Sequence, residues 1–164
     1  MKTKFLKAAI LASTVAALGL GATSAQAATA SATARAKILR QVTVTNTSDL
    51  QFGTIVTGAA ASTVVVSTAG ARTCGAGLVC SGATTAAGFN ITGTTGQVVT
   101  ISVPASVSLT SGANSMTATL SASAATATLV ASAGSFSVGG TLAVGASQAD
   151  GDYAGNFTAT VDYQ

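Results

Sequence analysis

Histidine, tryptophan and glutamate are absent from this chain, proline occurs once, and charged residues make up only 7% of it. The lack of histidine and glutamate removes side chains that commonly move protons in enzymes. Serine and threonine are plentiful, but no evident base is present to activate one of them as a nucleophile. No glycine loop of the phosphate-binding or dinucleotide-binding type occurs either. The composition therefore argues against an enzyme, and a hydrolase is the least favoured function.

The first residues have the features of a secretory signal. Lys2, Lys4 and Lys7 form a basic region, residues 8–20 are apolar, and Ala25-Gln26-Ala27 is an A-x-A cleavage site. A transmembrane anchor fits poorly because the apolar run is short and ends in small residues. The residue directly after the cleavage site is Ala28 and not a cysteine, which disfavours a lipoprotein anchor. Removal of residues 1–27 from the 164 leaves 137, enough for one domain with a buried core.

The charge balance changes once this signal is removed. The remaining cations are Arg35, Lys37, Arg40 and Arg72, and the remaining carboxylates are Asp49, Asp150, Asp152 and Asp162. These charges cancel, so nucleic-acid binding and attraction to an anionic membrane both lose their electrostatic basis. So little charge suits a surface that is covered by copies of the same chain. It equally suits a secreted protein whose hydroxyl groups keep it soluble.

Two cysteines in an exported chain indicate a disulfide between Cys74 and Cys80. A metal centre would need further ligands, and the chain has no histidine to supply them. We therefore expect no metal and no cofactor. A bond that closes so short a loop contributes roughly 2–3 kcal/mol to stability in the chain-entropy model.

Two groups of charged residues allow more than one interpretation. Asp150 and Asp152 flank Gly151, which is typical of a turn, although their oxygens would also suit a weak calcium site. Arg35, Lys37 and Arg40 form the main cluster of positive charge in the mature chain. They could protect the outer edge of an inserted strand from wrong pairing, or they could simply belong to a solvated tail.

The mature chain is predicted to be all-β. Helix formers are scarce, whereas threonine and valine recur between glycines, which favours a β-sandwich or barrel. Tight hairpins are expected at residues 93–96 and at Gly139-Gly140, and residues 111–133 fit either weak strands or a low-complexity loop. The expected strands are residues 41–45, 50–55, 62–68, 89–92, 98–103, 107–109, 116–120, 127–130, 136–138, 141–144 and 155–163.

Both ends of the mature chain alternate between apolar and polar residues, as a strand with one buried face does. Residues 28–38 have no preceding strand with which to pair. Such a strand either disorders or joins another sheet, and joining a neighbouring copy would make the protein a polymer subunit. The apolar face is formed by Ala30, Ala32, Ala34, Ala36 and Ile38 at the N-terminal end, and by Phe157, Ala159, Val161 and Tyr163 at the C-terminal end.

Four motifs, in their order along the chain, resemble a family of secreted bacterial pilin-like domains whose function is largely unassigned. They are TSDLQFGTI at residues 47–55, GFNITG at 88–93, GGTL at 139–142, and the closing GDYAGNFTATVDYQ at 151–164. The last has the alternating strand and penultimate tyrosine with which chaperone–usher pilins end. The family is similar to archaic-type chaperone–usher pilins and to spore-coat-protein-U-like domains.

The resemblance implies an immunoglobulin-like β-sandwich that lacks one strand and is completed by the N-terminal donor strand of another subunit. It implies that residues 28–38 are the donor strand, and that residues 157–163 lie along the receiving groove and meet a periplasmic chaperone. An outer-membrane usher is the second expected partner. Pilin donor strands usually carry larger apolar residues than these alanines, and Val42 and Val44 contribute if the donor segment runs longer.

These observations predict a signal at residues 1–27, a donor-strand extension at 28–38 and a β-sandwich domain at 39–164. The expected function is a structural subunit of an extracellular pilus or fimbria, polymerised by donor-strand exchange and serving adhesion or biofilm formation. Such a protein crosses the periplasm, retains no membrane span, and ends in a cell-surface fibre. The alternative is a non-polymeric secreted β-sandwich that binds carbohydrate or another surface partner.

Overall fold

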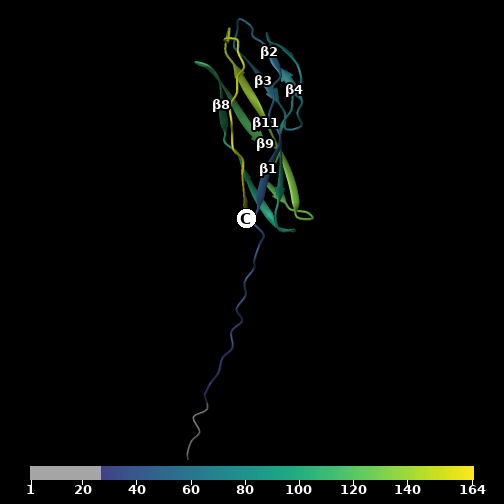
Figure 1. The fold of residues 1–164 in the computed structure, drawn as a ribbon, viewed down its shortest axis with the longest axis vertical. Coiled ribbons are helices and arrows are strands. Elements are labelled where there is room, and N and C mark those ends of the chain that lie inside the picture. Colours follow the sequence, from purple (N-terminus) through teal and green to yellow (C-terminus); the bar gives the residue numbers. More distant parts are fainter. Residues whose placement is uncertain (1–26) are drawn as a thin grey trace, which may run out of the picture. The chain divides into compact units, whose positions relative to one another are not determined.

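The computed structural model describes residues 27–164, and within this range the chain is all-β, without a helix. Lys37–Gln164 form one folded unit, and residues 27–36 belong to a separate N-terminal unit. The folded unit has the C-terminus at one end, here called the base, and β2 near the other, here called the tip (Figure 1). Apart from its last residue, the expected signal lies outside the described residues. Residues 28–38 carry no strand and all of them are exposed, so the expected donor strand has no pairing in the single chain.

Most of the strands lie where valine, threonine and alanine alternate. All the strand pairs are antiparallel, as in a β-sandwich. The strands are β1 (Thr43–Ser48), β2 (Thr54–Val56), β3 (Ser62–Val66), β4 (Arg72–Cys74), β5 (Val79–Ser81), β6 (Ala87–Thr92), β7 (Val98–Ser102), β8 (Ser106–Ser111), β9 (Asn114–Ala122), β10 (Thr126–Thr128), β11 (Ala133–Val144) and β12 (Thr160–Tyr163).

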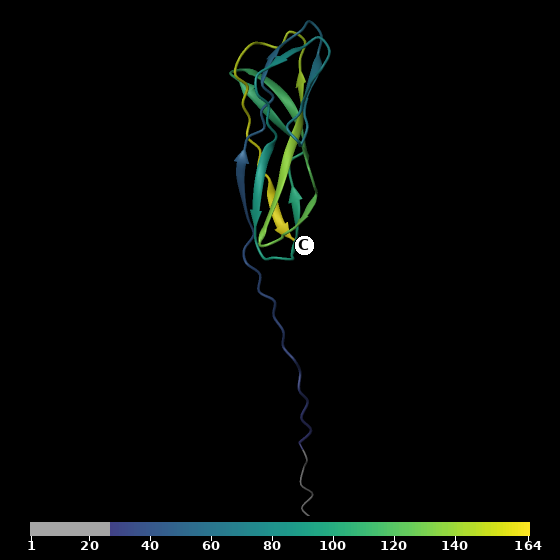
Figure 2. The same ribbon diagram turned by 90° about the vertical axis from the view of Figure 1, so that its right-hand side faces the viewer.

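The long strand β11 is the centre of the larger sheet. Its first half pairs with β6 and its second half with β3, while β9 pairs along its other edge. β1, β4 and β8 extend this sheet beyond β6, β3 and β9. A second layer consists of the sheet β10-β7-β12 towards the base and the short pair β2–β5 towards the tip (Figure 2). The larger sheet is therefore covered by different strands at its base and at its tip.

The core is divided between these two halves. At the base, the large sheet supplies Ile91 and Val138 and the smaller sheet supplies Val99 and Val161, all packed in one cluster. The rings of Phe89 and Phe136 stack there with their centroids 4.9 Å apart. At the tip, a separate cluster contains Phe52, Val64, Val66, Ala118, Leu142 and Val144. The predicted alternation of residues 157–163 is confirmed, because Ala159 and Val161 are buried while Thr158, Thr160 and Asp162 are exposed.

The hairpin predicted at Gly139-Gly140 is wrong, because β11 passes straight through both glycines. A tight hairpin of this type requires positive φ, and neither glycine has it. Gly139 instead packs against the backbone at the end of β3: a Cβ there would lie 2.5 Å from the carbonyl oxygen of Val66. The pair of glycines permits close packing of backbones in the middle of the sheet.

The hairpin predicted at residues 93–96 is also wrong. A turn does occur there, with the amide of Gln97 donating to the carbonyl of Thr94. β6 is already paired on both edges, with β1 and with β11, so the next strand cannot pair with it. The chain crosses to the other layer and forms β7. Residues 111–133, for which a loop was one expectation, contain all of β9 and all of β10.

The predicted disulfide between Cys74 and Cys80 is confirmed. It joins β4 to β5 and so ties the larger sheet to the short pair at the tip. Arg72 strengthens this connection, because its Nη1 donates to the carbonyls of Ser81 at 2.7 Å and Phe52 at 3.3 Å. Bonds of this charged group to neutral carbonyls are stronger than bonds between neutral groups. The β2–β5 pair is therefore held in place by both links.

Candidate functional site

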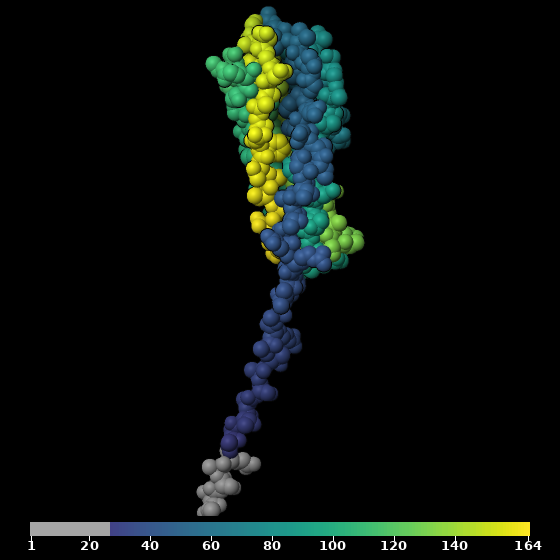
Figure 3. Space-filling view, viewed as in Figure 1, coloured from purple at the N-terminus to yellow at the C-terminus, as the bar shows by residue number. Residues whose placement is uncertain are grey.

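An open seam runs between β1 and the C-terminal segment, defined here as residues 145–164. Among the strands of residues 27–164, β1 pairs with β6 alone and β12 pairs with β7 alone. The two nevertheless lie side by side, as the blue and yellow segments of the space-filling view show (Figure 3). Each strand thus leaves one edge of backbone donors and acceptors without a strand partner, and unpaired edges of this kind are templates for another strand.

Tyr163 closes the seam at the base. Its hydroxyl donates to the carbonyl of Arg40 and accepts from the amide of Thr94, both at 2.7 Å. The amide of Arg40 in turn donates to the hydroxyl of Thr94 at 2.7 Å. Both backbone polar groups of Arg40 are therefore held, and the chain is fixed at the point where it joins the base.

Tyr163→Phe is expected to open the base without unfolding the protein. The variant leaves the Thr94 amide and the Arg40 carbonyl without their shared partner, at a cost of about 1–2 kcal/mol. Cleavage by trypsin after Arg40, which requires local opening, should rise roughly tenfold. Cleavage after Arg35, which is exposed, provides the control in the same digest. Equal cleavage rates at Arg40 in both proteins would show that the hydroxyl holds nothing.

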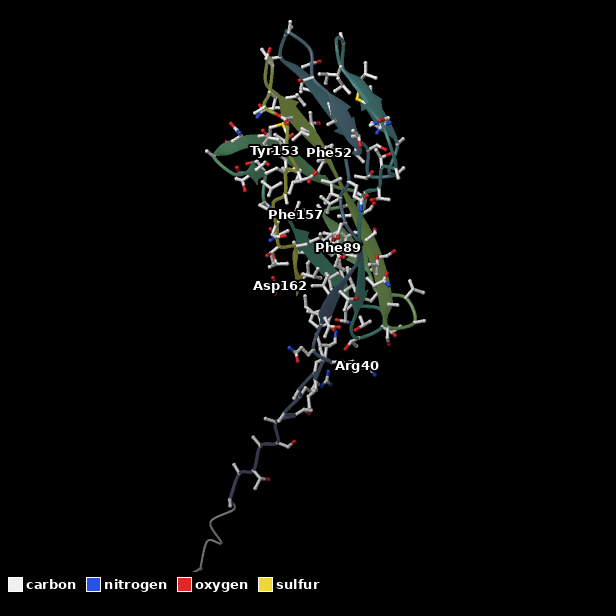
Figure 4. All side chains as sticks on the ribbon, turned by 45° about the horizontal axis from the view of Figure 1, so that its top comes forward. Arg40, Phe52, Phe89, Tyr153, Phe157 and Asp162 are labelled. Carbon is white, nitrogen blue, oxygen red and sulfur yellow. A yellow bond between two sulfur atoms is a disulfide. The ribbon has the colours of Figure 1, made fainter. Side chains whose placement is uncertain are left out.

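Towards the tip the seam widens into a groove formed by two adjoining cavities of about 780 and 340 Å³. Both cavities are lined by Leu50 and Phe52 on one side and by Tyr153 on the other. Figure 4 shows Phe52 and Tyr153 in this half, with Phe157 nearer to Phe89. The apolar floor comes from β8, β9 and β11, in the form of Leu109, Met116, Leu142 and Val144.

The groove exists because the second layer is thinner over the tip half. Over the base, the strands β7, β10 and β12 face the large sheet, whereas over the tip the facing elements are β2, β5 and the irregular start of the C-terminal segment. Leu50, Leu109 and Met116 consequently remain only half-buried. Apolar side chains in such a channel, bordered by unpaired strand edges, suit an extended peptide better than a compact polar ligand.

The C-terminal residues named from the sequence fall into three different positions. Phe157 lines the smaller cavity and makes an edge-to-face contact with Phe89, with centroids 6.2 Å apart. Ala159 and Val161 point into the core at the base. Tyr163 forms the base contact described above. Of these four side chains, therefore, Phe157 is the one in the groove wall, and β12 itself starts only at Thr160.

The donor residues named from the sequence are available but unengaged in the single chain. Ala30, Ala32, Ala34 and Ala36 are exposed, and Ile38 is 92% exposed. Sequence reasoning missed the floor of the groove, in particular Leu109 and Met116. The alternation of apolar and polar residues in β8 and β9 could have indicated these two residues. Burial alternates along both strands in the same way.

Metal-binding groups and membrane-spanning helices were both sought within residues 27–164. No group of three or more metal-binding side chains gathers in that part of the chain. No helix of the described residues has the length and apolar character needed to span a membrane.

Comparison with known proteins identifies one relationship. Residues 42–163 match the family described as "Domain of unknown function (DUF4402)". This range runs from just before β1 to the end of β12, so it includes both sides of the seam. No curated protein and no solved structure matches the chain.

Proposed function

Because the chain belongs to the DUF4402 family, a family of unknown function, we propose from its geometry that it is a structural subunit of an extracellular bacterial fibre. The subunits polymerise by donor-strand exchange, in which residues 28–38 of one copy occupy the groove of the next. The fibre serves adhesion to surfaces or biofilm formation. The observation that carries the proposal is the pairing of an apolar groove at the tip with an exposed, alternating extension that continues from the base.

Strand addition explains how a weakly apolar segment can bind. The added strand gains backbone hydrogen bonds along the unpaired edges, and its alternate side chains face the groove floor. Each alanine methyl contributes on the order of 0.8 kcal/mol when buried, so the backbone bonds carry much of the affinity. Ile38 is the one large apolar side chain of the extension.

The location of the two elements favours an open polymer. The chain joins the folded unit at the base, where Arg40 is anchored, whereas the groove lies towards the tip. Contacts between two different surfaces of one subunit are heterologous, and they form filaments when the rotation between neighbours does not close a ring. The nearly neutral mature chain, rich in hydroxyl groups, is compatible with burial among copies of itself.

A periplasmic chaperone and an outer-membrane usher complete the proposal. A subunit that carries an open apolar groove with free strand edges is prone to aggregate before assembly. A chaperone that supplies a temporary strand covers both features during transit. In this scheme the protein is exported with its signal, folds and forms its disulfide in the periplasm, and reaches the cell surface as a fibre.

Deletion of residues 28–37 tests this function in the cell that exports the protein. The deletion removes the donor strand but leaves the sandwich intact, so the expected result is secreted or periplasmic monomer and no fibre. A variant with residues 28–37 scrambled, which keeps their composition but breaks the alternation, is the matched control and is expected to fail as well. Normal fibres from the deleted chain would rule out donor-strand exchange.

The size of the purified mature protein distinguishes the proposed fibre subunit from the alternative function. The alternative is a non-polymeric secreted β-sandwich that binds carbohydrate or another surface partner. Donor-strand exchange is expected to give multimers that persist on dilution. A stable monomer that unfolds in a single transition, and whose unfolding is unaffected by the deletion, would favour the alternative.

A further inference from the structure

Three of the four cations of the mature chain lie in or next to the extension, and two of its four carboxylates line the groove. Arg35 and Lys37 lie in the extension, and Arg40 is anchored where the chain joins the base. Asp150 and Asp152 line the larger cavity near the tip, where both are exposed. The separation of charge is incomplete, because Arg72 bonds the carbonyls of Ser81 and Phe52 at the tip and Asp162 lies on β12 at the base.

Three of the large apolar side chains that remain exposed lie close to these charged groups, while the other two, Val98 and Val130, lie elsewhere in the folded unit. Ile38, beside the cations, is 92% exposed. Val56 and Val79 lie opposite each other in the β2–β5 pair at the tip, and they are 59% and 66% exposed. Val56 lines the same cavity as Asp150 and Asp152. The tip therefore presents carboxylates and valines together, and we call Val56, Val79, Asp150 and Asp152 the tip rim.

The closed base determines which way a strand can lie in the groove. The hydroxyl of Tyr163 joins the two sides of the seam at the base, whereas the cavities lie towards the tip. A donor strand fixed to its own subunit at Arg40 must therefore keep its last residues near the tip rim and extend its first residues towards Phe157. Eleven extended residues span about 36 Å.

Alternation then assigns the two faces of the donor strand. With Ala34, Ala36 and Ile38 facing the groove, Arg35 and Lys37 face outward along its rim. The exposed carboxylates of Asp150 and Asp152 line the larger cavity, at the end of the groove where residues 35–38 of the donor would lie. Lys37 would exchange its exposed bond to the side chain of Gln97, 2.8 Å long, for a bond to a carboxylate.

We propose that the tip rim is a docking surface for residues 35–38 of a second copy, in which Asp150 and Asp152 pair with Arg35 and Lys37 while Ile38 packs against Val56 and Val79. This inference rests on the proposed donor-strand exchange and adds its direction, its register and the end-to-end contact between subunits. Opposite charges set the register, since a shift of the strand by two residues keeps the alternation but separates the charges.

Charge exchange tests the register in the full chain. Arg35→Asp with Lys37→Asp places four carboxylates together, and the amount of fibre is expected to fall roughly fivefold, in keeping with two exposed ion pairs changed to repulsions. Asp150→Lys with Asp152→Lys should have the same effect. The four substitutions combined should restore most of the fibre. The differences in the amount of fibre between these variants and the unchanged chain should become smaller in 1 M salt, because the screening length there is about 3 Å.

Asp162→Lys is the matched control, because this exposed carboxylate lies on β12 at the base and is expected to leave fibre formation unchanged. If both charge exchanges leave fibre formation at the wild-type level while deletion of residues 28–37 abolishes it, the docking surface is wrong and donor-strand exchange stands. If the deletion also has no effect, the proposed function itself is wrong. Loss of fibre in both exchanges without recovery in the combination also contradicts the charge pairing.

A cross-link tests the end-to-end contact independently of charge. Ile38→Cys with Val56→Cys in one chain should produce a ladder of disulfide-linked multimers in the oxidising periplasm. Ile38→Cys with Val130→Cys is the control: Val130 is 72% exposed and follows Leu129, whose amide donates to Gln97 at the base. A ladder from the control pair and none from the first pair would reverse the orientation proposed here and overturn it.

Discussion

Gly139→Ala is expected to destabilise the folded unit by about 3 kcal/mol or more. The added Cβ would lie 2.5 Å from the carbonyl oxygen of Val66, 2.7 Å from the carbonyl carbon of Ser67 and 2.8 Å from the amide nitrogen of Thr68. All three are backbone atoms, so no side chain can turn aside to make room. The neighbouring pairs Gly140↔Val66 and Gly139↔Ser121 hold β11 between β3 and β9. Relief of the clash therefore requires the central ladder to separate.

Gly134→Ala in the same strand is the matched control. Its Cβ would meet the side-chain Cδ2 of Leu129 at 3.0 Å, and a side chain can adjust where backbone cannot. Alanine also lowers the entropy of the unfolded chain, which offsets part of the cost, so the change in unfolding free energy should stay within about 1 kcal/mol. Urea unfolding of both variants measures the difference. Equal stabilities would mean that Gly139 does not occupy a crowded backbone position.

Ile91→Ala is expected to lower the free energy of unfolding by about 2–5 kcal/mol. Ile91 has no exposed surface, and it lies in β6 between Val44 of β1 and Gly134 of β11. Its removal leaves a cavity in the base core, where strands of both layers meet. Because the base core fixes β1 against β12, the loss should loosen the seam as well as the sandwich.

Ile38→Ala is the control of identical chemistry at an exposed position. Ile38 is 92% exposed in the single chain, so its truncation should leave the unfolding midpoint of the monomer unchanged. Under the proposed docking it should reduce fibre formation instead. The two substitutions therefore distinguish effects on stability from effects on assembly. Ile91→Ala should lower the stability of the monomer, whereas Ile38→Ala should reduce fibre formation. A large loss of monomer stability from Ile38→Ala would show that this side chain is buried in the protein's own fold.

Individual strands were predictable where local pattern dominates. Residues 62–66 and 98–102 carry runs of valine and isoleucine, and strands formed where expected. Pairing partners were less predictable, as the two glycine-rich segments show. Gly93 and Gly139 both resemble hairpin positions, yet one starts a crossing between layers and the other lies inside a strand. A glycine can be needed for an unusual backbone conformation or for the close approach of another backbone segment. Only the residues that surround it in the folded structure show which of the two applies.

The groove was predictable only as an implication of family resemblance. Residues 157–163 alternate along their length, but the structure distributes them between the groove wall, the core and the base. The floor residues come from β8, β9 and β11, which are separated in the sequence and brought together by long-range pairing. The cavity forms because fewer strands of the second layer cover those floor strands. The local sequence pattern of a strand does not show whether another strand will cover it.

The sequence by itself determined the all-β character, the disulfide and the alternating ends, because residue types, cysteine pairing over a short loop and period-two patterns act locally. The tertiary structure alone decided that β11 runs unbroken through its glycines, that β1 and β12 meet without a ladder, and that the groove lies away from Arg40, which is held at the base. These features depend on which strands find each other across the chain, and that choice follows from the burial of the whole core.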